Sequence, residues 1–145
     1  MKLLFAIMLT FLLVSGNVAA KMVAVSTDQA EIRDSPSLDK AIVTLIAPRF
    51  YPLYVHEVQG DFYRVSDYLN NIGWIMKTLI SENRAVIVNT KSLNVFTGPG
   101  TNYPVQLKAE DGVTFKVISE EGNWLRVEHE NGMSGWLNRD LVWGD

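Results

Sequence analysis

The sequence predicts an all-β protein in which two tandem small β-barrels follow an N-terminal signal peptide. Three observations support this prediction. An apolar segment stands at the N-terminus, the rest of the chain contains an internal repeat, and each repeat shows the period of two that is typical of strands. After the N-terminal segment, no stretch has a sustained helical period.

The N-terminus has the three parts of a secretory signal. Met1–Lys2 supplies positive charge, Leu3–Val14 is almost entirely apolar, and Val18–Ala20 offers the small residues that a signal peptidase recognises. We therefore predict that residues 1–20 are a signal peptide that is cleaved at its end. The alternative is a membrane anchor, but the apolar run is shorter than the roughly 20 residues that span a bilayer. We expect no membrane span in the mature chain.

Composition and charge exclude several classes of function. The chain has 145 residues, no cysteine and a formal net charge of −3. Cleavage of the signal removes one lysine and no acidic residue, so 12 basic and 16 acidic residues leave a charge of −4. Binding to nucleic acid depends on neutralising phosphates, and an acidic chain does not do this, so we expect no nucleic-acid partner. The lack of cysteine excludes a disulfide framework and a thiol nucleophile.

The mature chain aligns with itself as two copies of one module with a single one-residue gap. We assign residues 22–80 to the first module and residues 84–143 to the second. The strongest matches are an Arg-Val pair after an opening glycine and a Gly-Trp pair: Gly60–Val65 with Gly122–Val127, and Gly73–Ile75 with Gly135–Leu137. The linker Ser81–Asn83 is short, so we expect the two modules to lie close together.

Each module is predicted to consist of short strands separated by turns. In the second module Val113, Phe115 and Val117 alternate with polar residues, which is the period of a half-buried strand. In the first module Pro52 falls inside the corresponding strand. Because proline removes a backbone donor, we expect that strand to lie at a sheet edge or to carry a bulge.

Several of these segments resemble a known family. Leu93–Pro99, Gly122–Val127 and Gly135–Leu137 resemble the signature segments of bacterial SH3 (SH3b) domains. Together with the matching segments of the first module and the ending Leu141–Gly144, they resemble exported tandem SH3-like proteins of Gram-negative bacteria. The resemblance implies small SH3-like barrels and a periplasmic location, with full secretion left open. Related modules bind cell-wall peptides, so the resemblance also implies a peptide or peptidoglycan ligand.

The first module departs from this pattern at two positions. Ser35 stands where the second module has Gly98, and Phe62 stands where it has Trp124. These differences favour the second module as the one that binds.

An aromatic–arginine pair recurs in both modules as Trp124/Arg126 and Phe62/Arg64. Residues two apart on a strand share a face, so each pair is expected to point outward together. An arginine can stack on an exposed ring, and its planar fork suits a carboxylate. In the alternative interpretation Trp124 only caps the barrel and Arg126 is solvated or paired within the chain.

Two further tryptophans, Trp74 and Trp136, each follow a glycine. The glycine would let the ring lie against the backbone, or it would adopt a positive φ at a bulge. Packing into the core is the alternative. With Tyr103 and Tyr51 these rings would line a groove that suits extended peptides or glycan rings.

No sequence pattern indicates catalysis. His56 and His129 are isolated, and no cluster of metal ligands accompanies them, so we expect no metal. The chain contains no P-loop, nucleophile elbow or dinucleotide fingerprint, so we expect no cofactor.

The sequence therefore predicts a non-catalytic binding module of the cell envelope that recognises cell-wall peptide or an envelope protein. The candidate ligand-binding residues are Trp124, Arg126, Trp136, Tyr103, Phe62, Arg64 and Trp74. A second hypothesis is a structural or assembly protein whose barrels pack face to face and dock an envelope complex. A cell-wall hydrolase is the third.

Overall fold

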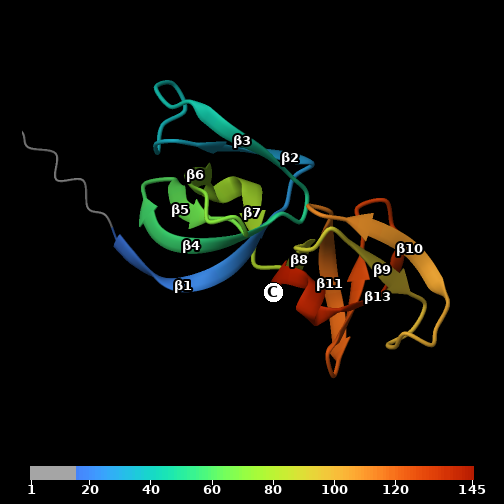
Figure 1. Ribbon diagram of the computed structural model, residues 1–145. Helices are drawn as coiled ribbons and strands as arrows, with labels where there is room; N and C mark the ends of the chain where they lie inside the picture. Colours follow the sequence, from blue (N-terminus) through green and yellow to red (C-terminus); the bar gives the residue numbers. More distant parts are fainter. Residues whose placement is uncertain (1–15) are drawn as a thin grey trace, which may run out of the picture.

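Strands dominate the computed structural model, which describes residues 16–145 (Figure 1). They form two seven-stranded antiparallel sheets, and the helical segments of this range are two short 3-10 turns. The predicted all-β class is confirmed. Most of the predicted signal peptide lies outside the described residues, and Gly16 begins the first strand. Neither helical turn is long and apolar enough to cross a membrane.

The first sheet has the strand order β3-β2-β6-β5-β4-β1-β7. Its elements are β1 (Gly16–Val25), β2 (Gln29–Arg33), β3 (Val43–Pro48), β4 (Pro52–Gln59), β5 (Phe62–Ser66), β6 (Ile72–Met76), the 3-10 turn η1 (Lys77–Leu79) and β7 (Ile80–Ser81).

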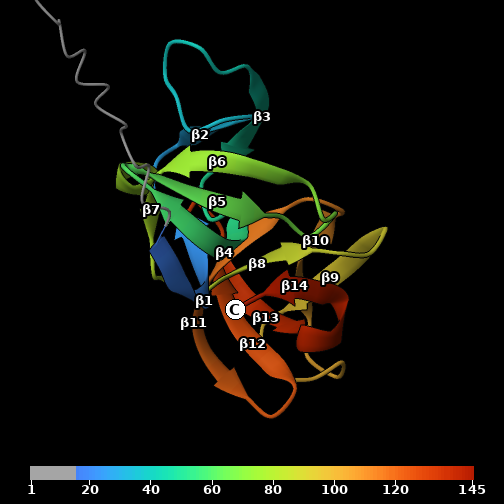
Figure 2. The ribbon, with the colours of Figure 1, turned by 90° about the vertical axis from the view of Figure 1, so that its left-hand side faces the viewer.

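The second sheet repeats this order with the corresponding strands, β10-β9-β13-β12-β11-β8-β14. Its elements are β8 (Ala85–Val88), β9 (Ser92–Phe96), β10 (Val105–Glu110), β11 (Thr114–Glu121), β12 (Trp124–Glu128), β13 (Ser134–Asn138), the 3-10 turn η2 (Arg139–Leu141) and β14 (Val142–Gly144). Figure 2 shows the two sheets one above the other.

Neither sheet closes into a barrel, which corrects the prediction of two small barrels. In the first sheet the edge strands β3 and β7 are not paired with each other. The two residues of β7 pair only with the end of β1. The side chains of Ile32 on β2, Leu45 on β3 and Leu53 on β4 line a cavity of about 280 Å³. As an edge strand, β3 leaves backbone donors and acceptors unpaired.

Pro52 opens an interior strand. Because β4 lies between β5 and β1, the expectation of an edge strand is wrong, whereas the alternative expectation of a bulge is confirmed by a register shift between Val55 and Glu57. β11 carries the same shift between Val117 and Ser119 without a proline, so the bulge belongs to the shared fold. As the first residue of its strand, Pro52 occupies a position where a missing N–H is tolerated.

Glycine is required where β2 meets β6 and where β9 meets β13. A Cβ at Gly73 would lie 2.3 Å from Ile32 Cγ2. A Cβ at Gly135 would lie 2.6 Å from Val95 Cγ1 and 2.8 Å from the Phe96 carbonyl oxygen. Neither glycine has a positive φ, so of the two expected roles the positive φ at a bulge is wrong. The requirement instead comes from the close approach of the neighbouring strand.

Each sheet surrounds an apolar core built from the inward positions of its strands. In the first core Leu53 and Ile75 are fully buried, and in the second Phe115, Leu125 and Leu137 are fully buried. The inward orientation expected for Phe115 from the period of two is confirmed.

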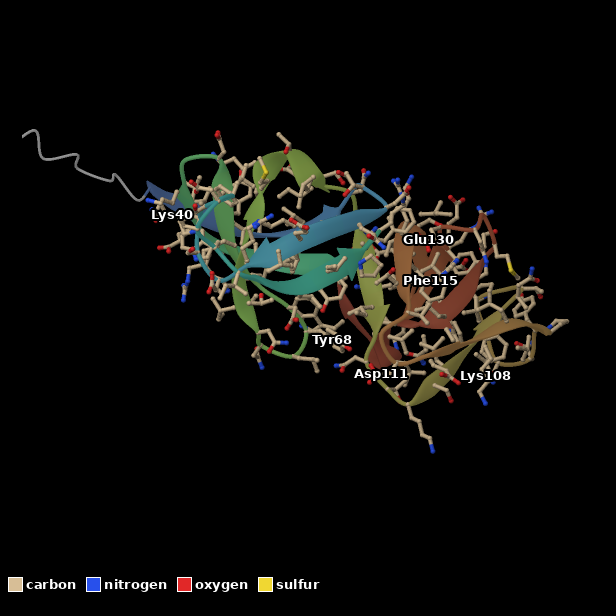
Figure 3. All side chains as sticks on the ribbon, turned by 90° about the horizontal axis from the view of Figure 1, so that it is seen from above. Lys40, Tyr68, Lys108, Asp111, Phe115 and Glu130 are labelled. Carbon is tan, nitrogen blue, oxygen red and sulfur yellow. The ribbon has the colours of Figure 1, made fainter. Side chains whose placement is uncertain are left out.

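The two halves of the chain pack against each other. Ile87 lies on β8 of the second sheet, yet it is fully buried in the core of the first, and Trp143 packs against the same core. The buried Thr114 hydroxyl donates a hydrogen bond of 2.7 Å to the backbone carbonyl of Arg49. Beside these contacts, Tyr68 of the first half faces Asp111 of the second, with 3.5 Å between the two oxygens (Figure 3). The expectation that the halves lie close together is therefore confirmed.

The Tyr51 side chain is buried and does not line a groove with Tyr103. Its hydroxyl donates to the buried Asp67 carboxylate at 3.1 Å. The same carboxylate accepts the backbone N–H groups of Leu69 and Asn71 at 2.9 Å, which orders the turn between β5 and β6. Burial, together with the negative charge of Asp67, raises the pKa of Tyr51 well above its usual range.

We expect Gly135→Ala to lower the free energy of unfolding by about 1–3 kcal/mol, because the added methyl group overlaps Val95 and the backbone of β9. Chemical denaturation measures the change. Ser134→Ala is the matched control one residue away and should alter stability by less than about 0.5 kcal/mol. Equal stability of the two variants would contradict the close approach described above.

Candidate functional site

A row of side chains crosses the outer face of the second sheet. Arg126 on β12 pairs with Trp136 on β13, Trp136 pairs with Phe96 on β9, and Phe96 pairs with Val105 on β10. Residues that are directly paired across strands point to the same face, so these four side chains are neighbours. Trp124 lies two residues before Arg126 and therefore shares that face. We call Trp124, Arg126, Trp136 and Phe96 the aromatic row.

The rings of the aromatic row contact one another while remaining accessible. Phe96 and Trp124 meet edge to face, with ring centroids 5.7 Å apart and an interplanar angle of 82°. Trp124 and Trp136 are half-buried, whereas Arg126 is exposed. Neither tryptophan belongs to the fully buried core, so both retain surface for a ligand.

Arg126 forms no ion pair with any residue that the structure describes. Its neighbour on β11 is Ser119, which carries no charge. The cation–π contacts of residues 16–145 involve Tyr63, so the expected stacking of Arg126 on Trp124 is not found. The guanidinium of Arg126 is thus available to an external anion.

In the equivalent row of the first sheet, both arginines lie beside a carboxylate of the same chain. Arg64 pairs in register with Glu57, and their side chains form an ion pair of 3.9 Å. Arg33 occupies the position of Phe96 and forms an ion pair with Glu31. Each arginine of this row therefore has an acidic partner within the chain, unlike Arg126, and the row lacks one of the aromatic rings of its counterpart.

The structure does not bring all the predicted residues into one site. Phe62 shares the face of Arg64 by alternation along β5, but it is only 8% exposed and so offers little surface to a ligand. Trp74 is half-buried and lies between Arg64 and Arg33. The junction between the halves uses Ile87 and other residues rather than the aromatic row, so that row is not an interface between the two halves.

Tyr103 lies in the loop that joins β9 to β10, at the end of the aromatic row. It is 44% exposed, and its ring packs over the backbone of the loop. A Cβ at Gly98 would lie 2.4 Å from the Tyr103 ring, so glycine is needed for this packing. At the matching positions the first module has Ser35 in place of Gly98 and no tyrosine in place of Tyr103. Because the glycine makes room for the tyrosine ring, the loss of one residue accompanies the loss of the other.

Sequence reasoning missed Phe96 as a site residue. The signal was present, because Phe96 lies within the segment that resembles SH3b domains and two residues beyond the outward-facing Asn94. What the sequence did not show is the pairing of Phe96 with Trp136, which links β9 to β13 across a long separation along the chain.

The histidines have local roles. The backbone N–H of Asn131 donates to His129 Nδ1 at 3.2 Å within the turn between β12 and β13, and His56 Nε2 lies 2.8 Å from the Ser66 hydroxyl. Within residues 16–145, no group of three or more His, Cys, Asp or Glu side chains is arranged to hold a metal.

Comparison with known proteins finds a family match in the second half of the chain. Residues 89–144 match the model of the bacterial SH3 domain, which confirms the family resemblance seen in the sequence. This segment contains every residue of the aromatic row.

The curated relatives are larger proteins. A putative N-acetylmuramoyl-L-alanine amidase, YrvJ of Bacillus subtilis, is 25% identical over 130 residues, which cover 81% of this chain and 24% of that protein. The probable cell wall amidase LytH of Staphylococcus aureus is 40% identical over 68 residues, covering 43% of this chain and 23% of that protein. The chain thus spans about a quarter of the length of these relatives.

Similar solved structures include an NlpC/P60 family protein from Bacillus cereus, with a TM-score of 0.40 and 14% identity over 86% of this chain and 56% of that chain. NlpC1 from Trichomonas vaginalis has the same TM-score, with 15% identity over 93% of this chain and 50% of that chain.

We expect Gly98→Ala to displace the Tyr103 ring from the loop while changing the free energy of unfolding by less than about 1 kcal/mol, because the tyrosine is a partly exposed loop residue. NMR contacts between the Tyr103 ring and residues 98–100 report the displacement. Retention of these contacts in the variant would show that the glycine is not what allows the ring to pack.

Proposed function

We propose that this chain is a non-catalytic binding module of the cell envelope that recognises a carboxylate-bearing peptide of the cell wall through the aromatic row. The single observation that carries the proposal is the state of Arg126. It is an exposed guanidinium without an internal partner, and aromatic rings stand beside it in register.

The chemistry of the aromatic row suits such a ligand. A guanidinium binds a carboxylate through two parallel hydrogen bonds, and this pairing is stronger than a neutral hydrogen bond. The half-buried rings of Trp124, Trp136 and Phe96 offer apolar surface to the side chains of an extended peptide. The first module has the same framework but neutralised arginines, so we assign binding to the second module.

The comparisons support a role at the cell wall. The matching family is a bacterial SH3 domain, and the curated relatives are named as a putative N-acetylmuramoyl-L-alanine amidase and a probable cell wall amidase. The chain corresponds to about a quarter of the length of those proteins. We propose that the part it shares with them holds a cell-wall ligand.

We also propose that the chain is exported by a signal peptide over residues 1–20 and acts as two tandem SH3-like modules, residues 22–80 and 84–143. The identical strand order of the two sheets supports the tandem arrangement. The N-terminal sequence pattern supports export, and the resemblance to Gram-negative exported proteins favours the periplasm.

The proposal is tested by sedimentation of the purified protein with peptidoglycan. We expect Ser119→Glu to weaken binding by about tenfold, because the new carboxylate would pair with Arg126 as Glu57 pairs with Arg64 in the first module. Arg126→Gln should weaken binding to a similar extent. Arg64→Gln is the matched control in the first module and should bind as the wild type does.

Failure of the wild-type protein to sediment with peptidoglycan would overturn the proposed ligand. Equal binding by Ser119→Glu and wild type would overturn the role of Arg126. Release of soluble wall fragments by the purified protein would contradict the non-catalytic assignment.

A second candidate function, docking to an envelope protein, is favoured by an exposed apolar patch on the first half. Its members are Ile42 just before β3, Ile46 on β3, Leu69 on the turn between β5 and β6, and Ile72 at the start of β6. All four side chains are at least half exposed. The aligned residues of the second half are Pro104, Lys108, Asn131 and Ser134, so the apolar character is confined to the first half.

If this patch docks a partner, Ile46→Lys, which introduces the residue found at the aligned position of the second half, should abolish crosslinking to that partner in cells. Peptidoglycan binding through the aromatic row should be unchanged. Crosslinking followed by mass spectrometry makes the comparison, and recovery of the same partner with the variant would exclude the patch as its docking surface.

A further inference from the structure

Two lysines converge on one tyrosine at an edge of the first sheet. The Nζ atoms of Lys21 on β1 and Lys77 on η1 lie 5.8 and 5.3 Å from the centre of the Tyr63 ring. The three side chains line a cavity of about 150 Å³ together with Ser81 and Glu82.

The second half carries two arginines at the positions aligned with these lysines. Arg84 corresponds to Lys21, and Arg139 corresponds to Lys77. The Asp145 carboxylate lies between the two guanidinium groups, with Oδ2 2.6 Å from Arg84 Nη2 and 3.0 Å from Arg139 Nη1. Glu120 pairs with both arginines from the other side. The hydrogen bonds from Arg84 lower the pKa of Asp145, so the group is held as a carboxylate.

The first half lacks this internal carboxylate. Asn83 is aligned with Asp145, and Val58 is aligned with Glu120. Glu82 is exposed and contacts Lys21 alone, with 2.5 Å between Nζ and Oε1. Among residues 16–145, no carboxylate lies within ion-pairing distance of Lys77. The cavity therefore holds two cations and only one internal anion.

We propose that the cavity of Lys21, Lys77 and Tyr63 is a second binding site, which takes the carboxylate of a peptide ligand in the place that Asp145 occupies in the second half. The carboxylate would accept hydrogen bonds from the Lys77 ammonium and from Lys21, and an adjacent small aliphatic group would contact the walls formed by Val23 and Ile80. The site shares no residue with the aromatic row, so it stands independently of the proposed function.

The test is a residue-resolved NMR titration of the purified chain with N-acetyl-alanyl-alanine and, separately, with its C-terminal amide. We expect the free carboxylate to shift the signals of Lys21, Tyr63, Lys77 and Ser81, and the amide to leave them unchanged. Lys77→Gln should weaken this binding by about tenfold, since a hydrogen bond between charged groups is lost. Lys108→Gln, an exposed lysine on β10, is the control and should bind as the wild type does (Figure 3).

A second variant gives the first half the carboxylate that the second half has at the aligned position. Asn83→Asp places a carboxylate at the position aligned with Asp145. The new carboxylate should pair with Lys77 inside the site. The Lys77 signals should therefore be shifted in the absence of ligand, and binding of the peptide should be abolished. Unchanged spectra of the remaining residues would show that each variant is folded.

Three results would overturn the inference: shifts of the same residues by the amide, wild-type affinity in Lys77→Gln, or unchanged peptide binding in Asn83→Asp. Inorganic phosphate is the comparison ligand, and affinity for it equal to that for the peptide would overturn the assignment to a carboxylate. Because signals are read residue by residue, shifts at Arg126 and Trp136 report the aromatic row separately. Failure of one site is thereby distinguished from failure of the other.

Discussion

The arrangement of both sheets depends on one close contact, in which a strand passes so near its neighbour that only glycine fits. Gly135 on β13 lies beneath Val95 and the backbone of Phe96, and Gly73 holds the same relation to Ile32. This contact brings the end of β9 onto β13 and so places Phe96 next to Trp136. The pairing of β9 with β13 is limited to Phe96 and Trp136. Without the close contact, the part of the aromatic row on β9 would be separated from the part on β12 and β13.

The two modules show how a repeated framework can acquire different surfaces. The strand order, the bulge in β4 and β11 and the buried glycines are common to both. Charge pairing differs, and in opposite directions at two places. On the outer face, the arginines of the first module are neutralised and Arg126 of the second is free. At the sheet edge, the second module is neutralised by Asp145 and the first is left with Lys77. Each module thus has one cationic side chain, Arg126 or Lys77, without an internal carboxylate partner. The aligned cation of the other module has such a partner.

Much of the fold could be predicted from the sequence, because the repeat and the period of two depend on local patterns. The all-β class and the inward orientation of Phe115 and Leu125 follow from such patterns. The open edge at β3 could not be predicted in this way, since closure depends on pairing between strands far apart in the chain. For the same reason the period of two could not show that neighbouring segments cover Phe62.

The candidate site was predicted in part. Trp124, Arg126 and Trp136 do share a face, since their positions follow from alternation along β12 and from the hairpin to β13. Phe96 and the free state of Arg126 were not predictable, because they depend on which strand lies alongside and on whether Ser119 or a carboxylate stands opposite.

The burial of Ile87 in the core of the opposite half has a geometric consequence for recognition. A flexible linker would let two binding modules search independently, but a shared core residue and the Thr114 hydrogen bond hold the halves in a fixed relation. The two proposed sites are therefore held at a fixed spacing. Under the proposed function, an extended polymer would gain avidity only if its repeating groups matched that spacing, and a short fragment would bind one site at a time.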